Sequence, residues 1–136
     1  GSIRPLRGVI STVAQLAASG LQLGVVCNST LPTQELSRRL DRLGMRGRFR
    51  CLVTSLATGS VKPDARIYAT ALSALDLSAT EVAYVGHDTA ELAGAARAGM
   101  RTIAVNHGRD AAADVFLDSF DQLLNLVSYQ PLRQAG

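Results

Sequence analysis

The sequence contains no tryptophan, only two cysteines, a single lysine and no long hydrophobic run. Its apolar runs fall far short of the ~20 residues that a membrane-spanning helix needs, so no membrane partner is expected. Cys27 and Cys51 both lie in apolar runs, where a cysteine usually acts as a small buried hydrophobe; a reduced, cytoplasmic compartment fits this usage. All other basic residues are arginine, which singles out Lys62.

What the chain does contain is enough apolar material for one folded domain, with 47% hydrophobic residues over 136 positions. The net charge of +3 is well mixed and does not require an anionic polymer as partner. Six arginines lie between Arg38 and Arg50, but Phe49 is the only aromatic among them, so a solvated helix face is favoured over a nucleic-acid surface. We expect an expression remnant at residues 1–2, one domain over residues 3–129 and a frayed tail at residues 130–136.

Short β-rich apolar runs alternate with segments of helical periodicity along the whole chain. Strands are predicted at 21–26, 51–55, 82–85, 101–106 and 115–117, and helices at 6–19, 32–43, 63–75, 120–127 and in the alanine-rich segment that ends at Gly99. Pro32 and Pro63 suit the first turns of two helices, and Ser119 and Gln122 have the spacing of a capping box. This alternation predicts an α/β domain with a parallel sheet.

Polar residues follow several of the predicted strands and should converge, because the carboxyl ends of parallel strands face one crevice. They are Cys27, Asn28, Ser29, Lys62, His87, Asp88, Glu91, Asn106 and His107. Lys62 is either a crevice residue or a solvated lysine at a helix start. His87 is either a ligand or a histidine hydrogen-bonded to Asp88 or to a neighbouring loop. Cys27 as a nucleophile would need a neighbouring base, and none is apparent.

Four stretches, in this order and spacing, resemble the haloacid dehalogenase-like hydrolases, in particular their phosphoglycolate-phosphatase-type branch. The stretches are PLRGVISTVAQLAASGLQLGVVCNS, VKPDARIYATAL, VAYVGHDTAELAGAARAGM followed by RTIAVN, and ADVFLDSFDQLL. The resemblance implies an incomplete Rossmann-like core of three layers, with helices on both faces of a parallel sheet. It also implies Mg²⁺-dependent hydrolysis of a small phosphorylated molecule through a phosphoaspartate.

Carried onto this chain, the resemblance implies a phosphate-binding turn at Cys27, Asn28 and Ser29. It implies that Lys62 balances charge at the nucleophile and the phosphoryl group. A metal site is implied at His87, Asp88 and Glu91.

Three departures from the family pattern bear on activity. No D-x-D motif, which would carry the nucleophile and the acid/base, occurs in the sequence. Cys27 replaces a serine or threonine that would bond the phosphoryl group, and a thiol is a weak donor. His87 replaces a carboxylate, although Mg²⁺ prefers oxygen ligands and imidazole suits Zn²⁺ better; an inward Asp88 would restore one oxygen.

Two kinds of function therefore stay open: a phosphatase-type core, expected to be inactive as this chain, and a non-catalytic interaction or regulatory module. A nucleotide-binding half-domain is disfavoured because no G-x-G-x-x-G follows a strand. In the family, the first strand lies between the strands that here begin near Leu23 and Val82. Without it, either these strands pair directly, or another chain fills the gap, or the domain self-associates. We expect direct pairing or a homodimer through open sheet edges.

Overall fold

The structure, a computed structural model, describes residues 3–127, with side chains from residue 8 onward. The predicted expression remnant at 1–2 and the predicted frayed tail at 130–136 lie outside the described residues. Helices and strands alternate as the sequence predicts. The elements are α1 (Ile3–Ala18), β1 (Gly24–Cys27), α2 (Thr33–Arg42), β2 (Cys51–Thr54), α3 (Ser55–Thr58), α4 (Ala65–Leu75), the 3₁₀ turn η1 (Ala79–Glu81), β3 (Ala83–Gly86), α5 (Thr89–Arg97), β4 (Arg101–Val105), β5 (Val115–Leu117), the 3₁₀ turn η2 (Phe120–Gln122) and α6 (Leu123–Leu126).

Several element ends differ from the sequence prediction for local reasons. Strand β1 begins three residues later than predicted, because its partner β2 begins at Cys51, opposite Gly24. Pro63 does not open a helix: α4 begins at Ala65, behind Asp64, whose side chain caps the helix. Residues 55–58, predicted as the end of a strand and the start of a loop, form the short helix α3.

The predicted terminator of one helix and the predicted cap of another are confirmed. Gly20, two residues after α1, has a φ of +94°, the left-handed conformation expected of a glycine that terminates a helix. Ser119 and Gln122 form the predicted capping box at the start of η2. The predicted helix over 120–127 is a 3₁₀ turn that continues into α6.

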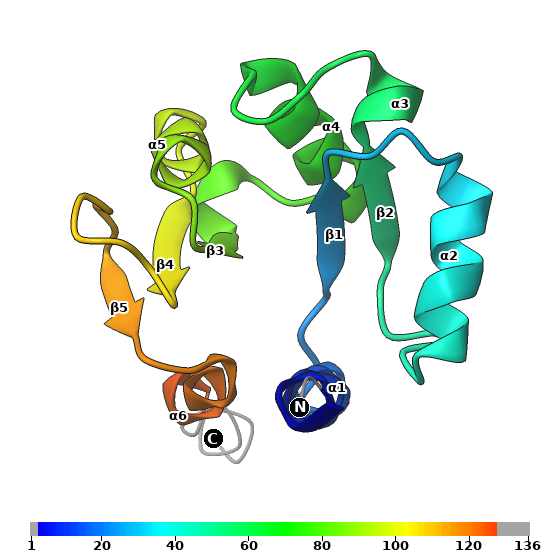
Figure 1. The fold of residues 1–136 in the computed structure, drawn as a ribbon. Helices are drawn as coiled ribbons and strands as arrows, with labels where there is room; N and C mark the ends of the chain where they lie inside the picture. The colour runs from blue at the N-terminus through cyan, green and yellow to red at the C-terminus, as the bar shows by residue number, and fades with distance from the viewer. Residues whose placement is uncertain (1–2, 128–136) are drawn as a thin grey trace, which may run out of the picture.

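All strand pairs are parallel, but the strands form two sheets and not one (Figure 1). One sheet pairs β1 with β2, and the other has the order β3, β4, β5. The prediction that β1 and β3 pair directly is therefore wrong: within the described residues, their facing edges are unpaired.

Helices cover both faces of these sheets, as predicted. One core cluster contains Val53 of β2, Ile67, Tyr68 and Ala71 of α4, and Ala95 of α5. The other joins Leu16 of α1 and Leu123 of α6 to Ile103 and Val105 of β4. Because successive side chains of a strand point to opposite faces, the consecutive buried residues 102–105 of β4 show a strand covered on both sides.

Candidate functional site

Asn28 joins the end of β1 to the loop before α4 through both atoms of its amide. Its Oδ1 accepts from the backbone N–H of Lys62 at 2.8 Å, and its Nδ2 donates to the carbonyl of Lys62 at 3.4 Å. The Asn28 side chain thereby pairs with the Lys62 backbone as a neighbouring strand would, and it fixes the position of Lys62 in the loop. The predicted convergence of Asn28 and Lys62 is present in the structure.

The ammonium group of Lys62 lies beside the carboxyl end of β3. Its Nζ donates to the hydroxyl oxygen of Tyr84 at 3.2 Å and lies 3.2 Å from Oε1 of Glu91. The Lys62 side chain is only 12% exposed and that of Glu91 21%, so the pair is largely shielded from solvent. Burial lowers the pKa of Lys62, but the bonds to Tyr84 and Glu91 outweigh it and raise that pKa above its usual value.

Two tyrosines, Tyr68 and Tyr84, hold Lys62 and Glu91 in this arrangement. The ring of Tyr68, fully buried in α4, packs edge-on against Tyr84 with centroids 5.7 Å apart, and its hydroxyl donates to the carbonyl of Glu91 at 2.7 Å. Burial raises the pKa of both tyrosines, so each stays a neutral hydrogen-bonding group. Tyr84 is a functional neighbour that sequence reasoning missed, since it reads as one more apolar residue of a strand.

The turn after β1 is held by Ser55, the first residue of α3. The N–H of Ser29 donates to Oγ of Ser55 at 2.7 Å, and the same Oγ donates to the Ser29 carbonyl at 3.0 Å. The Ser29 hydroxyl accepts from the N–H of Leu31 at 3.0 Å. Cys27 makes only a weak thiol contact, 3.8 Å to the Asn28 carbonyl. Ser55 was also missed, although its place at the end of a predicted strand was a usable signal.

His87, Asp88 and Glu91 follow β3, as predicted, but each is engaged differently. Asp88 caps α5, its Oδ1 accepting from the N–H of Glu91 at 2.9 Å. Glu91 faces Lys62, and His87 is exposed. Among the described residues, no group of three or more histidine, cysteine, aspartate or glutamate side chains could hold a metal ion. These side chains, as arranged, do not fit Mg²⁺, which needs several converging oxygens.

Asn106 and His107 directly follow β4, as predicted. Asn106 has a positive φ of 51°, a conformation that asparagine tolerates better than most residues. The imidazole of His107 packs edge-on against Phe116 of β5, with centroids 4.8 Å apart.

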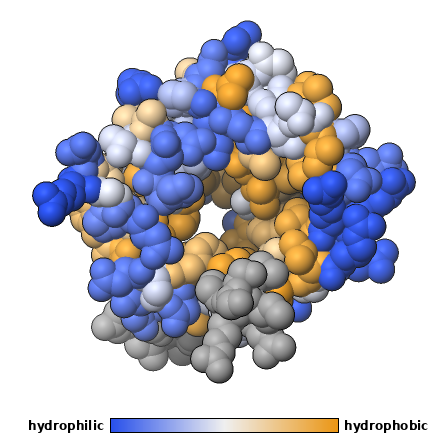
Figure 2. Space-filling model, in the orientation of Figure 1, coloured by the Kyte–Doolittle hydropathy of each residue, from blue (hydrophilic) through white to orange (hydrophobic). Residues whose placement is uncertain are grey.

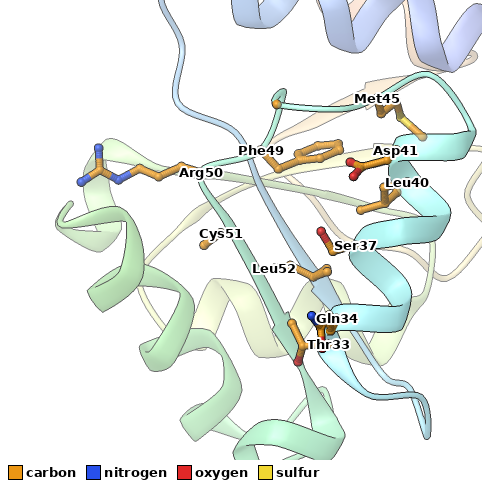
Figure 3. Close-up of a pocket in the computed structure, with 11 residues that line it drawn as sticks. Thr33, Gln34, Ser37, Leu40, Asp41, Met45, Phe49, Arg50, Cys51 and Leu52 are labelled. Atoms are coloured by element: carbon orange, nitrogen blue, oxygen red, sulfur yellow. The ribbon is translucent and has the colours of Figure 1, made fainter.

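A hollow between α2 and β2 contains none of the predicted site residues (Figure 3). Its volume is about 520 Å³, and Leu40, Met45 and Phe49 contribute apolar side chains to it. Arg50 lines it, but its guanidinium points away in Figure 3, and Asp41 is paired with Arg46 at 3.9 Å. Nothing in this hollow resembles a site for an anion.

Comparison with known proteins decides the family. The model of the haloacid dehalogenase-like hydrolases matches residues 1–105. The chain belongs to this family. It is 31% identical to a glyceraldehyde 3-phosphate phosphatase of Methanopyrus kandleri, over 92% of this chain and 57% of that protein. It is 29% identical to a phosphoglycolate phosphatase of Pectobacterium atrosepticum, over 89% of this chain and 54% of that protein.

Solved structures place the chain in the same fold. A 2-haloacid dehalogenase from Pseudomonas syringae superposes with a TM-score of 0.75 at 27% identity, covering 89% of this chain and 52% of that one. CbbY from Rhodobacter sphaeroides, solved in complex with phosphate, gives a TM-score of 0.71 at 28% identity, with 85% and 54% covered. The chain thus spans little more than half the length of the family members it matches. No helix among residues 3–127 is long and apolar enough to cross a membrane.

Proposed function

We propose that this haloacid dehalogenase-like chain binds the phosphoryl group of a small phosphorylated molecule at the carboxyl ends of β1 and β3. The observation that carries the proposal is the shielded ammonium of Lys62, held at that point by Asn28, Tyr84 and Glu91. Lys62 is the residue that balances the charge of the phosphoryl oxygens. The family's phosphatases, by their names, act on small phosphorylated molecules, which supports this class of ligand.

The hydrogen-bonding capacity of Lys62 allows for such a ligand. A lysine ammonium has three N–H donors. Tyr84 and Glu91 account for two of them among the described residues. The third can donate to a phosphoryl oxygen, while the raised pKa keeps the group charged at neutral pH.

The turn residues act mainly by shaping the site. Asn28 binds the backbone of Lys62, and the Ser29 backbone binds Ser55, so both are positioning residues. Cys27 stands where the family has a hydroxyl donor, and its thiol contributes little to phosphate binding.

The same proposal holds that this chain alone does not hydrolyse its ligand. The sequence contains no D-x-D motif to supply an attacking carboxylate and an acid/base. The family resemblance assigns His87, Asp88 and Glu91 to the metal site. Asp88, however, accepts a hydrogen bond from the N–H of Glu91 as the cap of α5, and the Glu91 side chain pairs with Lys62. We derive no catalytic step through magnesium for this reason.

A phosphatase assay tests the proposed lack of turnover. The purified chain and Lys62→Ala are incubated with p-nitrophenyl phosphate, with and without Mg²⁺. We expect the two proteins to release nitrophenol at the same background rate. Mg²⁺-dependent release by the parent that Lys62→Ala abolishes would contradict the proposal.

A non-catalytic interaction or regulatory module is the second candidate. The ion pair between Lys62 and Glu91 favours it, because it neutralises the cation that a phosphatase core would direct at its substrate. We place either function in the cytoplasm, in one domain over residues 3–129, and propose a homodimer through open sheet edges as its assembly. Neither candidate turns over substrate, so phosphate binding separates them: binding by the purified chain would favour the first candidate, and its absence would favour the module.

A further inference from the structure

The positive charge of the chain is concentrated in residues 33–50, which contain α2 and the loop before β2. This segment has six arginines and only two acidic residues, Glu35 and Asp41. Its surplus of four positive charges exceeds the net charge of +3 of the whole chain, so the remaining residues are slightly acidic together. Figure 2 shows a broad hydrophilic patch over α2, at the right of the view, with hydrophobic side chains at its inner margin. The arginines are Arg38, Arg39, Arg42, Arg46, Arg48 and Arg50.

The ion pairs of this segment leave most of its charge uncompensated. Glu35 is shared by three arginines of α2, at N–O distances of 3.7, 3.6 and 3.5 Å, and Asp41 lies 3.9 Å from Arg46. Arg48 and Arg50 have no acidic partner among the described residues. All six arginines are exposed. Their guanidinium groups can therefore take carboxylates from another molecule, which arginine binds with paired hydrogen bonds.

The same segment borders an apolar hollow. The hollow between α2 and β2 has a volume of about 520 Å³, within the range of roughly 300–1,000 Å³ that is usual for ligand sites. Leu40, Met45, Phe49 and Leu52 line it with apolar side chains. Of the six arginines only Arg50 lines it, and its guanidinium points away in Figure 3. An apolar group fits inside this hollow, while acidic groups belong outside it.

The edge of β2 adds main-chain groups to this surface. Within the described residues, β2 pairs with β1 alone. The N–H of Arg50 donates to the carbonyl of Leu23, toward β1, so the next residue, Cys51, directs its N–H and C=O to the opposite edge. The Cys51 side chain packs against the core cluster that contains Ile67 and Ala71 of α4, which leaves its backbone to line the hollow. An added polypeptide strand uses such an edge.

We propose that the hollow between α2 and β2, with the arginines of residues 33–50, is a docking site for an extended acidic peptide segment of another protein. One large apolar residue of the peptide enters the hollow, and carboxylates on both sides of it pair with the arginines. The peptide main chain bonds the edge of β2 at Cys51. Nucleic acid fits less well, because Phe49 is the only aromatic residue of the segment. The proposal does not depend on phosphate binding at Lys62.

Fluorescence anisotropy with the whole chain and a labelled peptide tests this inference. The probe has one leucine between two blocks of three glutamates. One control peptide has serine in place of the leucine, and another has glutamine in place of the glutamates. We expect both controls to bind at least tenfold more weakly than the probe. Equal binding of the serine control would show unspecific attraction of polyanions and overturn the proposal. So would equal or tighter binding of a single-stranded RNA with six phosphates, or no binding of the probe.

A pair of variants tests whether the hollow receives the leucine. Ser37 of α2 is exposed and lines the hollow, so the large side chain of Ser37→Phe should fill it without entering the core. We expect this variant to bind the probe at least tenfold more weakly. Ser73→Phe, at an exposed serine of α4, is the control and should bind like the parent. Equal affinity of the two variants would place the peptide elsewhere.

A second pair tests the arginines. Arg46→Glu combined with Arg48→Glu reverses two charges beside the hollow and should weaken binding of the probe at least tenfold. Arg97→Glu combined with Arg109→Glu changes the net charge equally at two exposed positions of α5 and the loop after β4. This control should lose at most threefold. A similar loss in both double variants would reduce the effect to net charge and contradict a defined site.

The main-chain bonds have a readout of their own. N-methylation of the probe at its leucine should weaken binding at least tenfold, and N-methylation of its first glutamate should not. Binding of the unmodified probe should slow hydrogen exchange of the Cys51 amide. Unchanged affinity after methylation at the leucine, or unchanged exchange at Cys51, would contradict strand addition. Self-association of the chain that the probe reverses would make a second copy the occupant and overturn the proposal.

Discussion

At the scale of single residues, Asn28 matters through its amide and not through contact with a ligand. A net hydrogen bond contributes about 1 kcal/mol, so Asn28→Ala should lower the free energy of unfolding by about 1–2 kcal/mol through loss of both bonds to Lys62. Asn28→Asp keeps the acceptor for the shorter bond and should lose about half as much. Urea denaturation measures the free energy of unfolding of both variants. Equal stability of Asn28→Ala and the parent would contradict a stabilising link between Asn28 and Lys62.

Asp64, at the start of α4, contributes to the stability of the fold in a pH-dependent way. Its carboxylate accepts from the N–H and the guanidinium of Arg66, which lowers its pKa from 3.8 to about 2. Because the pKa of Asp64 is lower in the folded state, its carboxylate stabilises the folded protein fully above pH 3.8. This stabilisation is lost as the pH falls toward 2. Asp64→Asn keeps a capping side chain, so its stability should decline less steeply than the parent's over that window. Melting temperatures measured as a function of pH check this, and an equally steep decline in the parent and in Asp64→Asn would refute the proposed role of Asp64.

Which site residues the sequence could reveal depends on whether their partners are local. Lys62 stood out because it is the only lysine and lies before a helix, and the structure brings it to Asn28. Tyr84 could not be foreseen, because its role arises only when α4 places Tyr68 against it. The same holds for the pairing of Glu91 with Lys62, which depends on how α5 packs.

At the scale of elements, the contact between α5 and the Lys62–Pro63 loop requires a glycine. A Cβ on Gly94 would lie 2.7 Å from the Pro63 ring and 2.9 Å from its carbonyl oxygen. Alanine is the better helix former by about 1 kcal/mol, but overpacking costs about 1–3 kcal/mol, so Gly94→Ala should destabilise. Gly8→Ala in α1, where a Cβ meets nothing within 4 Å, should stabilise by about 0.5–1 kcal/mol. Chemical denaturation of both variants checks the contrast, which would fail if they shifted alike.

The start of α5 distinguishes capping from metal binding. Asp88→Ala should lower the free energy of unfolding by about 1 kcal/mol, because the N–H of Glu91 loses its acceptor. Asp88→Asn keeps the cap and should be nearly as stable as the parent, with or without Mg²⁺. A Mg²⁺-dependent rise in melting temperature that Asp88→Asn removes would instead make Asp88 a ligand.

Element types were predictable, and their ends were less so. Apolar periodicity gave the strands and the long helices, because it reports burial directly. The shortened β1 and the delayed start of α4 depend on which partner strand is present and on a side-chain cap, and neither is visible in periodicity.

At the scale of the whole molecule, the parallel α/β layout was predictable, but the arrangement of the strands was not. The expectation that β1 and β3 pair was wrong, because the two strands belong to separate sheets and border a hollow that residues of α1 and α4 also line. Strand neighbours are set by such long-range packing, on which a local pattern carries no information. The proposed phosphate site spans the same division, with Asn28 on the β1 side and Tyr84 and Glu91 on the β3 side.

Phosphate binding measured by calorimetry on the parent, Lys62→Met and Arg66→Met tests the central claim most directly. Arg66→Met is the matched control, since it removes one positive charge from an exposed position four residues after Lys62 in the sequence. We predict that Lys62→Met weakens inorganic phosphate binding at least tenfold, about 1.4 kcal/mol, while Arg66→Met leaves it nearly unchanged. Equal affinity in all three proteins, or no phosphate binding by the parent, would contradict a phosphate site built around Lys62.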